Sequence, residues 1–366
     1  MNDLFDLPIG ALTARMRAGT LSPVDLVEAH IERATALDAT LNIFTRTRYD
    51  AAREEARAMA ERYRRNDAVP VLAGVPCSIK EMIQVEGMPQ TAGLVWRRHF
   101  VAERDATVVR RLRRAGAVVL GVTNVPEAGL WMETHNRLYG RTGNPWDPRR
   151  TPGGSSGGEG AIIAAGGAVF GLGSDIGGSI RIPSAFCGVL GHKPSGGLVP
   201  TTGHWPNDGS GGAMLCIGPI ARSVDDLRLL LTTLSGPDGL DWAVKFPPPR
   251  FGPERADMRG VKVFPLLENS GLKVEAEVGE GVERAVRALV DAGATLGRVR
   301  PGLLDRAVDI WAAAMDALES ESLADLMGGD RPTKLRYELP NILMRRSRHT
   351  PMALGALMLQ RVSGLL

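Results

Sequence analysis

The stretch that most constrains this chain is residues 151–188, where two clusters of glycine and serine enclose a short apolar segment. The first cluster covers 153–158 and the second covers 175–179. Glycine at this density allows tight turns and exposes backbone N–H groups to their surroundings. A flexible linker is the alternative, but the apolar runs 161–165 and 168–172 predict a small-residue helix and a buried strand. Serines on glycine-rich turns between packed elements indicate a site in which backbone amides surround a hydroxyl nucleophile.

The composition is that of an ordinary globular protein. Hydrophobic residues make up 44% of the 366 residues and charged residues 23%, so the chain can bury a large core. The net charge of +3 is too small to indicate a nucleic-acid partner, and we expect none. The N-terminal residues show no basic region followed by an apolar run, which predicts no secretory signal. Cys77, Cys187 and Cys216 are odd in number and far apart, which argues against a disulfide framework and for the cytoplasm.

Apolar periodicity and turn signals predict strands that alternate with helices. Ser22 and Pro23 predict a helix start, because serine caps a helix and proline suits its first turn. Further helices are expected at 51–65, 105–116, 223–235, 277–292 and 303–327, and strands at 71–79, 117–122, 261–266 and 295–299. This alternation predicts an α/β fold with a central mixed, mainly parallel β-sheet covered by helices on both faces. The Pro- and Gly-rich piece 236–253 is the best candidate for an internal joint.

Residues 340–366 mix arginines with leucines and methionines. We expect a core-facing amphipathic helix there, and the alternative is peripheral contact of this basic, apolar segment with a membrane. No uninterrupted apolar stretch of the sequence reaches the length of a membrane span.

Two familiar signatures are absent. The sequence has no G-K-[ST] phosphate loop and no H-E-x-x-H metal site. The six histidines show no ligand spacing, so no metal or cofactor is expected, although a Ser-His-Asp triad stays open. A serine with a lysine remains: Lys80 follows the apolar run 75–79, where burial would lower the pKa of its amine and make it a general base. Considered alone, Lys80 is better explained as an exposed residue at a strand end.

Three long motifs give the chain a resemblance to the amidase signature family. They are GVPCSIKEMIQVEGMPQTAG around Lys80, YGRTGNPWDPRRTPGGSSGGEGA, and FGLGSDIGGSIRIPSAFCGVLGHKPS. They occur in the family's order, and Ser155 and Ser179 lie 24 positions apart. The GGSSGGEGA form with Glu159, and the FCG that begins at Phe186, most resemble the branch that contains the fatty acid amide hydrolases.

The resemblance implies a serine–serine–lysine mechanism. Ser179 would be the nucleophile that accepts the acyl group, and Ser155, held by a cis peptide bond after Gly154, would bridge Ser179 and Lys80. Lys80, neutral at rest, would draw a proton through Ser155 and later return it to the leaving nitrogen. Four consecutive backbone N–H groups would form the oxyanion hole: those of Ile176, Gly177, Gly178 and Ser179. Amide hydrolysis needs these parts, because the nucleophile must be activated, the oxyanion stabilised and a poor leaving group protonated.

Supporting and substrate-binding residues are expected around this triad. Ser156 would support the network by hydrogen bonding. Asp175 and Arg181 could form a buried charge pair that sets the loop, although we favour a simple structural pairing of the two. By analogy with the family, the segment 132–136 would line the acyl pocket, and 201–216 is a second candidate wall. The substrate-binding candidates on these two loops are Met132, Thr134, His204 and Trp205.

The resemblance covers nearly the whole chain and implies a single amidase domain over 1–366 that lacks the usual C-terminal portion. It implies a cofactor-free hydrolase that converts a small carboxylic amide to an acid plus an amine or ammonia, with a homodimer left open. Two alternatives remain, an amidotransferase component that acts on misacylated transfer RNA with a partner, and an inactive, truncated family member. The acyl group is not identified, because fold and catalytic motifs do not fix it.

Overall fold

The computed structural model describes residues 4–207, 214–252, 257–266, 274–300, 302, 304–316 and 322–363. The chain divides into two compact units, Met1–Pro249 with Ser320–Leu366, and Arg250–Glu319. The boundary after Pro249 falls inside the joint expected at 236–253. A single amidase domain over the whole chain stays a prediction.

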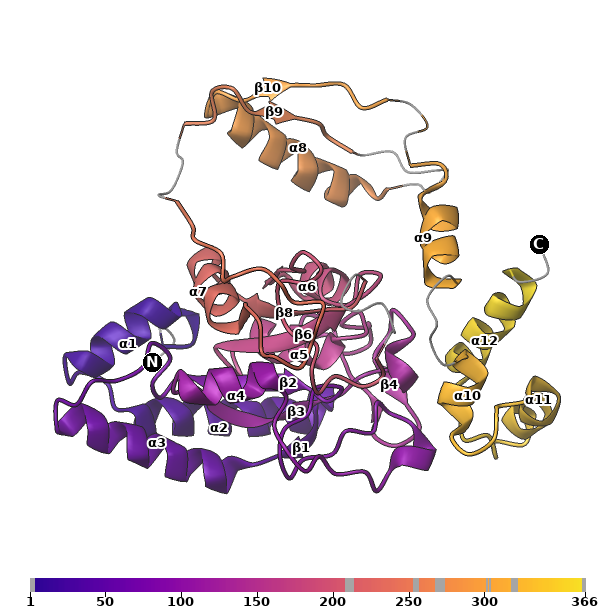
Figure 1. Ribbon diagram of the computed structural model, residues 1–366, viewed down its shortest axis with the longest axis horizontal. Helices are drawn as coiled ribbons and strands as arrows, with labels where there is room; N and C mark the ends of the chain where they lie inside the picture. The colour runs from indigo at the N-terminus through magenta and orange to yellow at the C-terminus, as the bar shows by residue number, and fades with distance from the viewer. Residues whose placement is uncertain are drawn as a thin grey trace. The chain divides into compact units, whose positions relative to one another are not determined.

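A six-stranded mixed sheet forms the centre of the first unit (Figure 1). In spatial order its strands are β1 (Phe44–Thr47), β3 (Val118–Thr123), β2 (Pro76–Lys80), β6 (Phe170–Asp175), β8 (Cys216–Ala221) and β7 (Leu190–Gly191). β3, β2 and β6 pair in parallel, and the outer strands pair antiparallel. The predicted α/β fold with a mixed sheet is confirmed, but its parallel part is limited to the three central strands. Parallel neighbours need a crossover, which α4 (Thr107–Arg114) supplies between β2 and β3 and α5 (Gly157–Ala164) supplies before β6.

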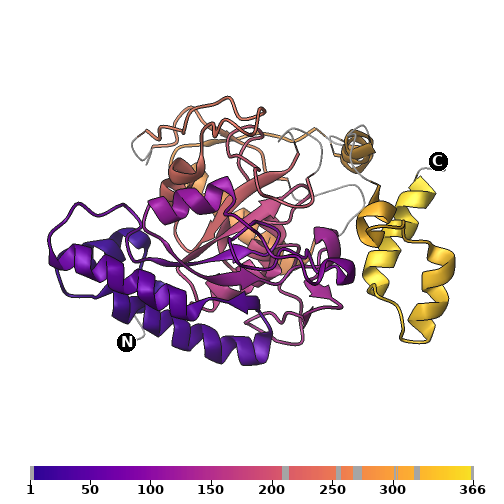
Figure 2. The same ribbon diagram turned by 60° about the horizontal axis from the view of Figure 1, so that its bottom comes forward.

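Helices cover both faces of this sheet, as predicted (Figure 2). One face packs against α1 (Ile9–Arg17), α4 and α7 (Val224–Leu234), and the other against α2 (Pro23–Leu41), α3 (Tyr49–Arg64) and α5. Adjacent strand residues point to opposite faces, so Val119 joins the first core and Val118 the second. A register shift between β2 and β3 then places Val122 opposite Ile79, and Thr123 opposite Lys80. Lys80 and Thr123 therefore share the face that α5 covers.

Serine residues cap the start of two of the expected helices. Ser22 Oγ accepts a hydrogen bond of 3.1 Å from Val24 N at the start of α2, with proline at the first helical position. Ser223 Oγ accepts one of 3.3 Å from Asp226 N at the start of α7. Each cap satisfies one of the backbone donors that a helix N-terminus leaves unpaired.

The second unit holds β9 (Lys262–Val263), α8 (Ala276–Asp291), β10 (Thr295–Leu296) and α9 (Ala307–Asp316). β9 and β10 form a short parallel pair, so the two predicted strands are confirmed but are only two residues long. The helix expected over 303–327 is divided into α9 and α10 (Leu323–Gly328), and residues 303 and 317–321 of that range lie outside the described residues.

The single helix expected over 340–366 is wrong in its extent. α11 (Leu335–Leu343) ends near the start of that range and α12 (Pro351–Ser363) begins after a turn. The two helices and α10 share a small core made of Met327, Leu335, Ala353, Leu354 and Leu357. The break covers residues 344–350, which are mostly basic or polar, and α12 begins at Pro351, a residue type that suits the first turn of a helix. Within the described ranges, no helix combines the length and apolarity that crossing a bilayer requires.

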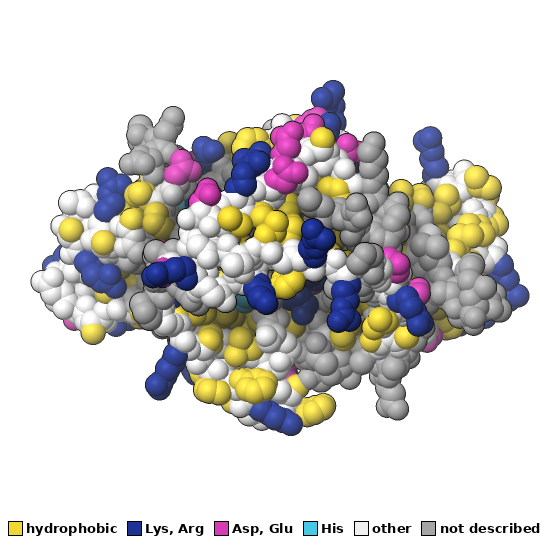
Figure 3. Space-filling view, turned by 90° about the horizontal axis from the view of Figure 1, so that it is seen from above, with side chains coloured by type: hydrophobic (Ala, Val, Ile, Leu, Met, Phe, Trp, Pro, Cys, Tyr) yellow, Lys and Arg dark blue, Asp and Glu magenta, His cyan; other side chains and the backbone are white. Residues whose placement is uncertain are grey.

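The surface carries charges of both signs. On the face drawn in Figure 3, Lys and Arg side chains stand apart from one another among apolar and acidic side chains. The thiols of Cys77, Cys187 and Cys216 are buried, as expected for cysteines that pack as small apolar side chains.

Candidate active site

Lys80 is the last residue of β2 and its side chain is only 1% exposed. Cys77 and Ile79 on the same strand pack into the core on one side of the sheet, so Lys80 points to the other side. The alternative of an exposed lysine at a strand end is therefore wrong. The apolar sequence that precedes Lys80 places its amine in the interior, as the sequence predicted.

The Lys80 amine is held by two oxygens. Its Nζ donates to Ser155 Oγ at 2.7 Å and to the carbonyl oxygen of Ser174 at 3.3 Å. Burial lowers the pKa of Lys80 to about 7, although the negative charges of Asp175 and Glu159 act in the opposite direction. Near neutral pH a large fraction of this amine is unprotonated, which a general base requires.

Ser155 lies in a tightly packed backbone segment and is 2% exposed. The peptide bond between Gly154 and Ser155 is cis, as the resemblance implied. A Cβ on Gly154 would lie 2.6 Å from the carbonyl oxygen of Trp131, so glycine is required for this close approach. Thr134 Oγ1 donates to the carbonyl oxygen of Gly153 at 2.9 Å and fixes the same segment from the other side.

Ser156 connects the two glycine–serine clusters. Its N–H donates to the carbonyl oxygen of Ser179 at 3.1 Å. Its hydroxyl is buried and lies 3.3 Å from both the N–H and the carbonyl oxygen of Ser174. Ser156 therefore makes the supporting hydrogen bonds that the sequence predicted, and it attaches the start of α5 to β6.

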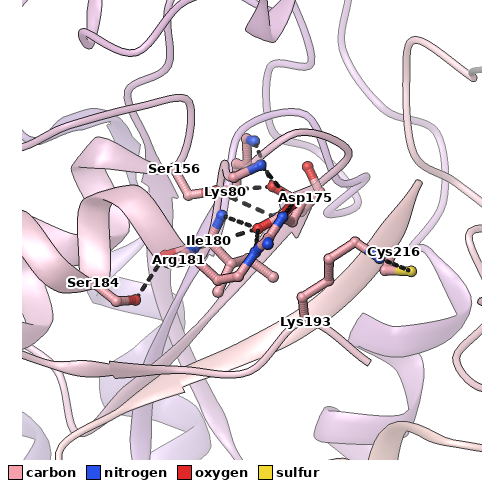
Figure 4. Close-up of polar contacts among 10 residues, drawn as sticks. Lys80, Ser156, Asp175, Ile180, Arg181, Ser184, Lys193 and Cys216 are labelled. Carbon is pink, nitrogen blue, oxygen red and sulfur yellow. Dashed lines mark hydrogen bonds and ion pairs between the residues drawn. The ribbon is translucent and has the colours of Figure 1, made fainter. Parts of the chain in front are cut away.

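Asp175 organises the loop that follows β6 (Figure 4). Its carboxylate accepts from Gly178 N at 2.8 Å, from Ile180 N at 3.0 Å, and from two nitrogens of the Arg181 guanidinium at 3.0 and 2.9 Å. Burial alone would raise the pKa of Asp175, but these hydrogen bonds outweigh it and hold that pKa below its usual value. The predicted charge pair is present, but only the Asp175 side chain is buried, because Arg181 is 56% exposed.

Three backbone N–H groups of the loop after β6 make no hydrogen bond to another described residue. Within the described residues, the N–H groups of Ile176, Gly177 and Ser179 have no hydrogen-bond acceptor. The N–H of Gly178 is the exception among the four expected oxyanion donors, because Asp175 Oδ1 accepts it. Gly178 has a φ of +128°, which favours glycine and explains the residue type at this turn.

Ser179 itself is half-buried, in contrast to Lys80 and Ser155. In the described part of the chain its hydroxyl has no hydrogen bond to Ser155 Oγ, so the geometry contains the Lys80–Ser155 contact and not the second contact of a relay. The two serines are joined through the backbone by Ser156. The assignment of catalytic and oxyanion-hole roles stays a prediction.

The substrate-binding candidates differ in their exposure to solvent. Met132 is 55% exposed, whereas Thr134 is buried and committed to Gly153. Trp205 packs against Met82, Ala92 and Val125. Residues 208–213 of the second candidate wall lie outside the described residues.

His204 lies inside the site and does not line an open loop. One ring nitrogen lies 2.8 Å from Ser174 Oγ and the other 2.8 Å from the carbonyl oxygen of Pro206. Burial, followed by the charge of Lys80, lowers the pKa of His204 to about 3, so the ring is neutral. Its contact with the residue whose carbonyl accepts from Lys80 is a support that sequence reasoning missed. Only the position of Gly203–His204 in a dense Gly/Pro loop hinted at a fixed location.

A second missed feature is a buried contact to the C-terminal segment. Glu127 accepts a hydrogen bond from Thr350 N at 2.7 Å, and its other oxygen lies 3.0 Å from His349 Nδ1. Glu127 begins a short 3₁₀ helix, Glu127–Gly129, whose last residue lies close to Ser155 Oγ and to Met82. The segment after Ser320 is thus fastened beside the backbone that packs on Ser155.

Comparison with known proteins gives one consistent result. A profile of the Amidase family matches residues 25–352. Fatty-acid amide hydrolase 2-A of Danio rerio is 34% identical over 97% of this chain and 69% of its own length. A glutamyl-tRNA(Gln) amidotransferase component of Moorella thermoacetica is 38% identical over 80% of this chain and 60% of its own. The crystal structure of a bacterial aryl acylamidase of the amidase signature family superimposes with a TM-score of 0.75 and 30% identity, over 97% of this chain and 75% of that one.

Proposed function

Because this chain belongs to the amidase family, whose members include hydrolases that act on amides, we propose that it cleaves a small carboxylic amide through a serine acyl-enzyme. The products are an acid and an amine or ammonia. The observation that carries the proposal is the 2.7 Å hydrogen bond between Lys80 Nζ and Ser155 Oγ in the protein interior. A buried lysine amine that is hydrogen-bonded to a serine hydroxyl is an arrangement suited to proton transfer.

In the first half-reaction Ser179 Oγ attacks the amide carbon. Its proton passes to Ser155 Oγ as the Ser155 proton passes to the neutral Lys80 amine. For this the Ser179 hydroxyl must turn towards Ser155 when substrate binds, and such contacts commonly tighten only in the complex. The oxyanion that forms is stabilised by the unpaired N–H groups of Ile176, Gly177 and Ser179.

The proton on Lys80 then returns through Ser155 to the leaving nitrogen. The carbon–nitrogen bond breaks, the amine departs, and the acyl group remains on Ser179. In the second half-reaction the neutral Lys80 takes a proton from water through Ser155, and the resulting hydroxide attacks the acyl carbon. Return of the proton to Ser179 Oγ releases the acid and restores the starting state.

The test is turnover of a panel of aryl and alkyl amides by Ser179→Ala and Lys80→Met. Ser179→Ala removes the nucleophile and Lys80→Met removes the base, so we expect losses of at least about 10³-fold in each. Ser184→Ala is the matched control, because the buried Ser184 hydroxyl donates to the carbonyl oxygen of Ile180 at 2.7 Å without approaching the proposed relay. Full activity in Ser179→Ala would contradict the proposal.

A second candidate function is that of an amidotransferase component that acts on misacylated transfer RNA with a partner. The 38% identity to the Moorella thermoacetica protein favours it. Both functions use the same hydrolytic steps, so the difference lies in the partner. Glutamine-dependent amidation that appears only with added partner proteins would support the second candidate, and turnover of small amides by the isolated chain would support the first.

A further inference from the structure

Glu159 carries a carboxyl group in the protein interior, where removal from water costs free energy. It is the third residue of α5, four positions after Ser155, and its side chain is fully buried. Its two oxygens are met by hydroxyl groups and not by a charged side chain: Ser78 Oγ donates to one and Thr123 Oγ1 to the other, both at 2.7 Å. A buried carboxyl group that is fully hydrogen-bonded is retained at a cost in free energy, which calls for an explanation.

The two hydroxyls flank Lys80 in the sheet. Ser78 lies two residues before Lys80 on β2 and points to the same face. Thr123 is the residue of β3 directly opposite Lys80 in the register. The Glu159 carboxyl group therefore binds the sheet at two points beside Lys80. One is Ser78 on β2, the strand of the lysine, and the other is Thr123 on the neighbouring strand β3.

A third strand is shaped to receive the carboxyl group. Gly171 on β6 pairs with Ser78, and a Cβ at Gly171 would collide with Glu159 Oε2. On the helix side, Gly158 N donates to the carbonyl oxygen of Asn124 at 3.3 Å, and a Cβ at Gly158 would come within 2.8 Å of Asn124 N. Glycines thus allow α5 and β6 to close around Glu159, which identifies this as a fitted socket.

We propose, on the basis of the function proposed above, that Glu159 is a positioning residue that holds Ser155 against Lys80 by fastening α5 to β2 and β3. Ser155 lies two residues before the start of α5 and Lys80 ends β2, so any shift between these elements changes the distance between Nζ and Oγ. A hydrogen bond of 2.7 Å weakens steeply when its geometry changes. Glu159 touches neither the substrate nor the reacting atoms and acts through the Lys80–Ser155 contact.

The charge state of Glu159 matters to Lys80 as well. Burial raises the pKa of Glu159 to about 8, with Ser78, Thr123 and Lys80 opposing the rise. The ionised carboxylate of Glu159 favours the charged lysine, and the raised pKa of Glu159 weakens that effect near neutral pH. The other groups that face this cluster are Asp175, which favours the charged lysine, and the neutral His204. The Cys77 thiol points to the other face of the sheet, and burial raises its pKa.

The test compares Glu159→Gln with Glu159→Ala in the full chain. Glutamine is uncharged and of the same size, and its amide can accept from one hydroxyl and donate to the other. We expect its kcat to stay within about 5-fold of wild type at neutral pH. Alanine breaks both contacts and opens a polar cavity that water can enter, so we expect kcat to fall about 100-fold with KM nearly unchanged.

A lysine-selective measurement gives a readout that is independent of turnover. The chain has six lysines, so ¹³Cε labelling of lysine yields a simple spectrum in which Lys80→Met assigns the signal of Lys80. Water in the emptied socket would solvate the ammonium, so the pKa of Lys80 should rise by about one unit or more in Glu159→Ala and stay level or fall in Glu159→Gln. If the wild-type chain hydrolyses no amide, the proposed function fails, and this titration still decides the role of Glu159.

Asp226→Ala is the matched control. Asp226 on α7 is another buried carboxyl group that is satisfied by a hydrogen bond, from Ile9 N at 2.9 Å. The substitution should lower the thermal midpoint without moving kcat or the pKa of Lys80. Wild-type kcat in Glu159→Ala, equal losses in both Glu159 variants, or a Glu159→Ala profile that matches Asp226→Ala would each overturn the proposal.

Discussion

The two ends of the site meet solvent differently. Lys80 and Ser155 are 1% and 2% exposed, whereas Ser179 is half-buried and Gly177 is exposed. The first end is held by side chains that pack between strands, and the second by hydrogen bonds from its own backbone to Asp175. We call Lys80 with Ser155 the closed half of the site, and Ser179 with the loop 176–179 the open half.

This difference follows from what each half must do. A lysine works as a base near pH 7 only if burial removes the stabilising water from its ammonium. A nucleophile must be reachable by its substrate, so its loop cannot be rigidified by burial in the same way. Asp175 supplies the rigidity instead, because one fully buried carboxylate orders several N–H groups of the loop. The closed half sets the pKa of Lys80, and the open half fixes the position of the loop that carries Ser179.

Ser155→Ala tests the connection between the two halves, because it removes the hydroxyl that would pass a proton from Ser179 to Lys80. We expect kcat to fall about 10³-fold, because the proton of Ser179 loses its path to Lys80. Burst kinetics with an activated ester would show slow acylation. A loss confined to deacylation would count against the relay.

Asp175→Asn tests the open half. The amide keeps the size of the side chain but loses its charge, so the hydrogen bonds from Arg181 and the loop weaken, and we expect kcat/KM to fall about 30-fold to 100-fold. Removal of a negative charge near Lys80 should also move the acid limb of the pH profile to lower pH. An acid limb that moves to higher pH would contradict this assignment of the charges.

Thr134→Val should have a smaller effect. Valine keeps the volume but removes the hydrogen bond to the carbonyl oxygen of Gly153, so the Ser155 segment loses one restraint. We expect a loss of about 3-fold to 10-fold in kcat with KM unchanged, measured on the best amide of the panel. A change in KM alone would instead favour the substrate-binding role first expected for Thr134.

Lys80→Met tests the closed half through stability. The pKa of Lys80 is about 7 in the folded protein and has the usual value of 10.5 when unfolded. Between these values the unfolded chain binds more protons, so this residue makes the fold less stable as pH falls from 10.5 to 7. The inactive Lys80→Met variant should therefore be more stable than wild type near pH 7, by up to a few kcal/mol (about 1.4 kcal/mol per unit). The difference should narrow as the pH rises towards the unfolded pKa, and thermal unfolding at several pH values would show this.

Sequence patterns predicted the closed half better than the open one. The apolar run before Lys80 favoured a buried amine only together with the three long motifs, and capping serines located two helices correctly. The hydrogen bond from Thr134 to Gly153 was not predicted, because nothing in the neighbourhood of Thr134 signals a contact 19 residues away, and its substrate-binding role stays a prediction. The contact between His204 and Ser174 was also hidden, since it depends on the path by which a Gly/Pro loop returns to the sheet.

The socket of Glu159 shows the same limit. It depends on a register shift in β3 that turns Thr123 towards α5 and on a glycine of β6 that leaves room for a carboxyl oxygen. Periodicity reports which face of a strand is buried but cannot report a shift of one position in its pairing. The sequence marked Glu159 only as a feature of one family branch, and its physical role became visible when three strands were brought together.

The central claim is that a neutral Lys80 activates Ser179 through Ser155. It is tested most directly by the rate at which a fluorophosphonate labels Ser179 as a function of pH, in wild type and in Lys80→Met. We predict that the wild-type rate rises through a pKa near 7, and that Lys80→Met labels at least about 100-fold more slowly with no such rise. A rate that is flat through pH 7 in wild type, or a rise that survives in Lys80→Met, would contradict the claim.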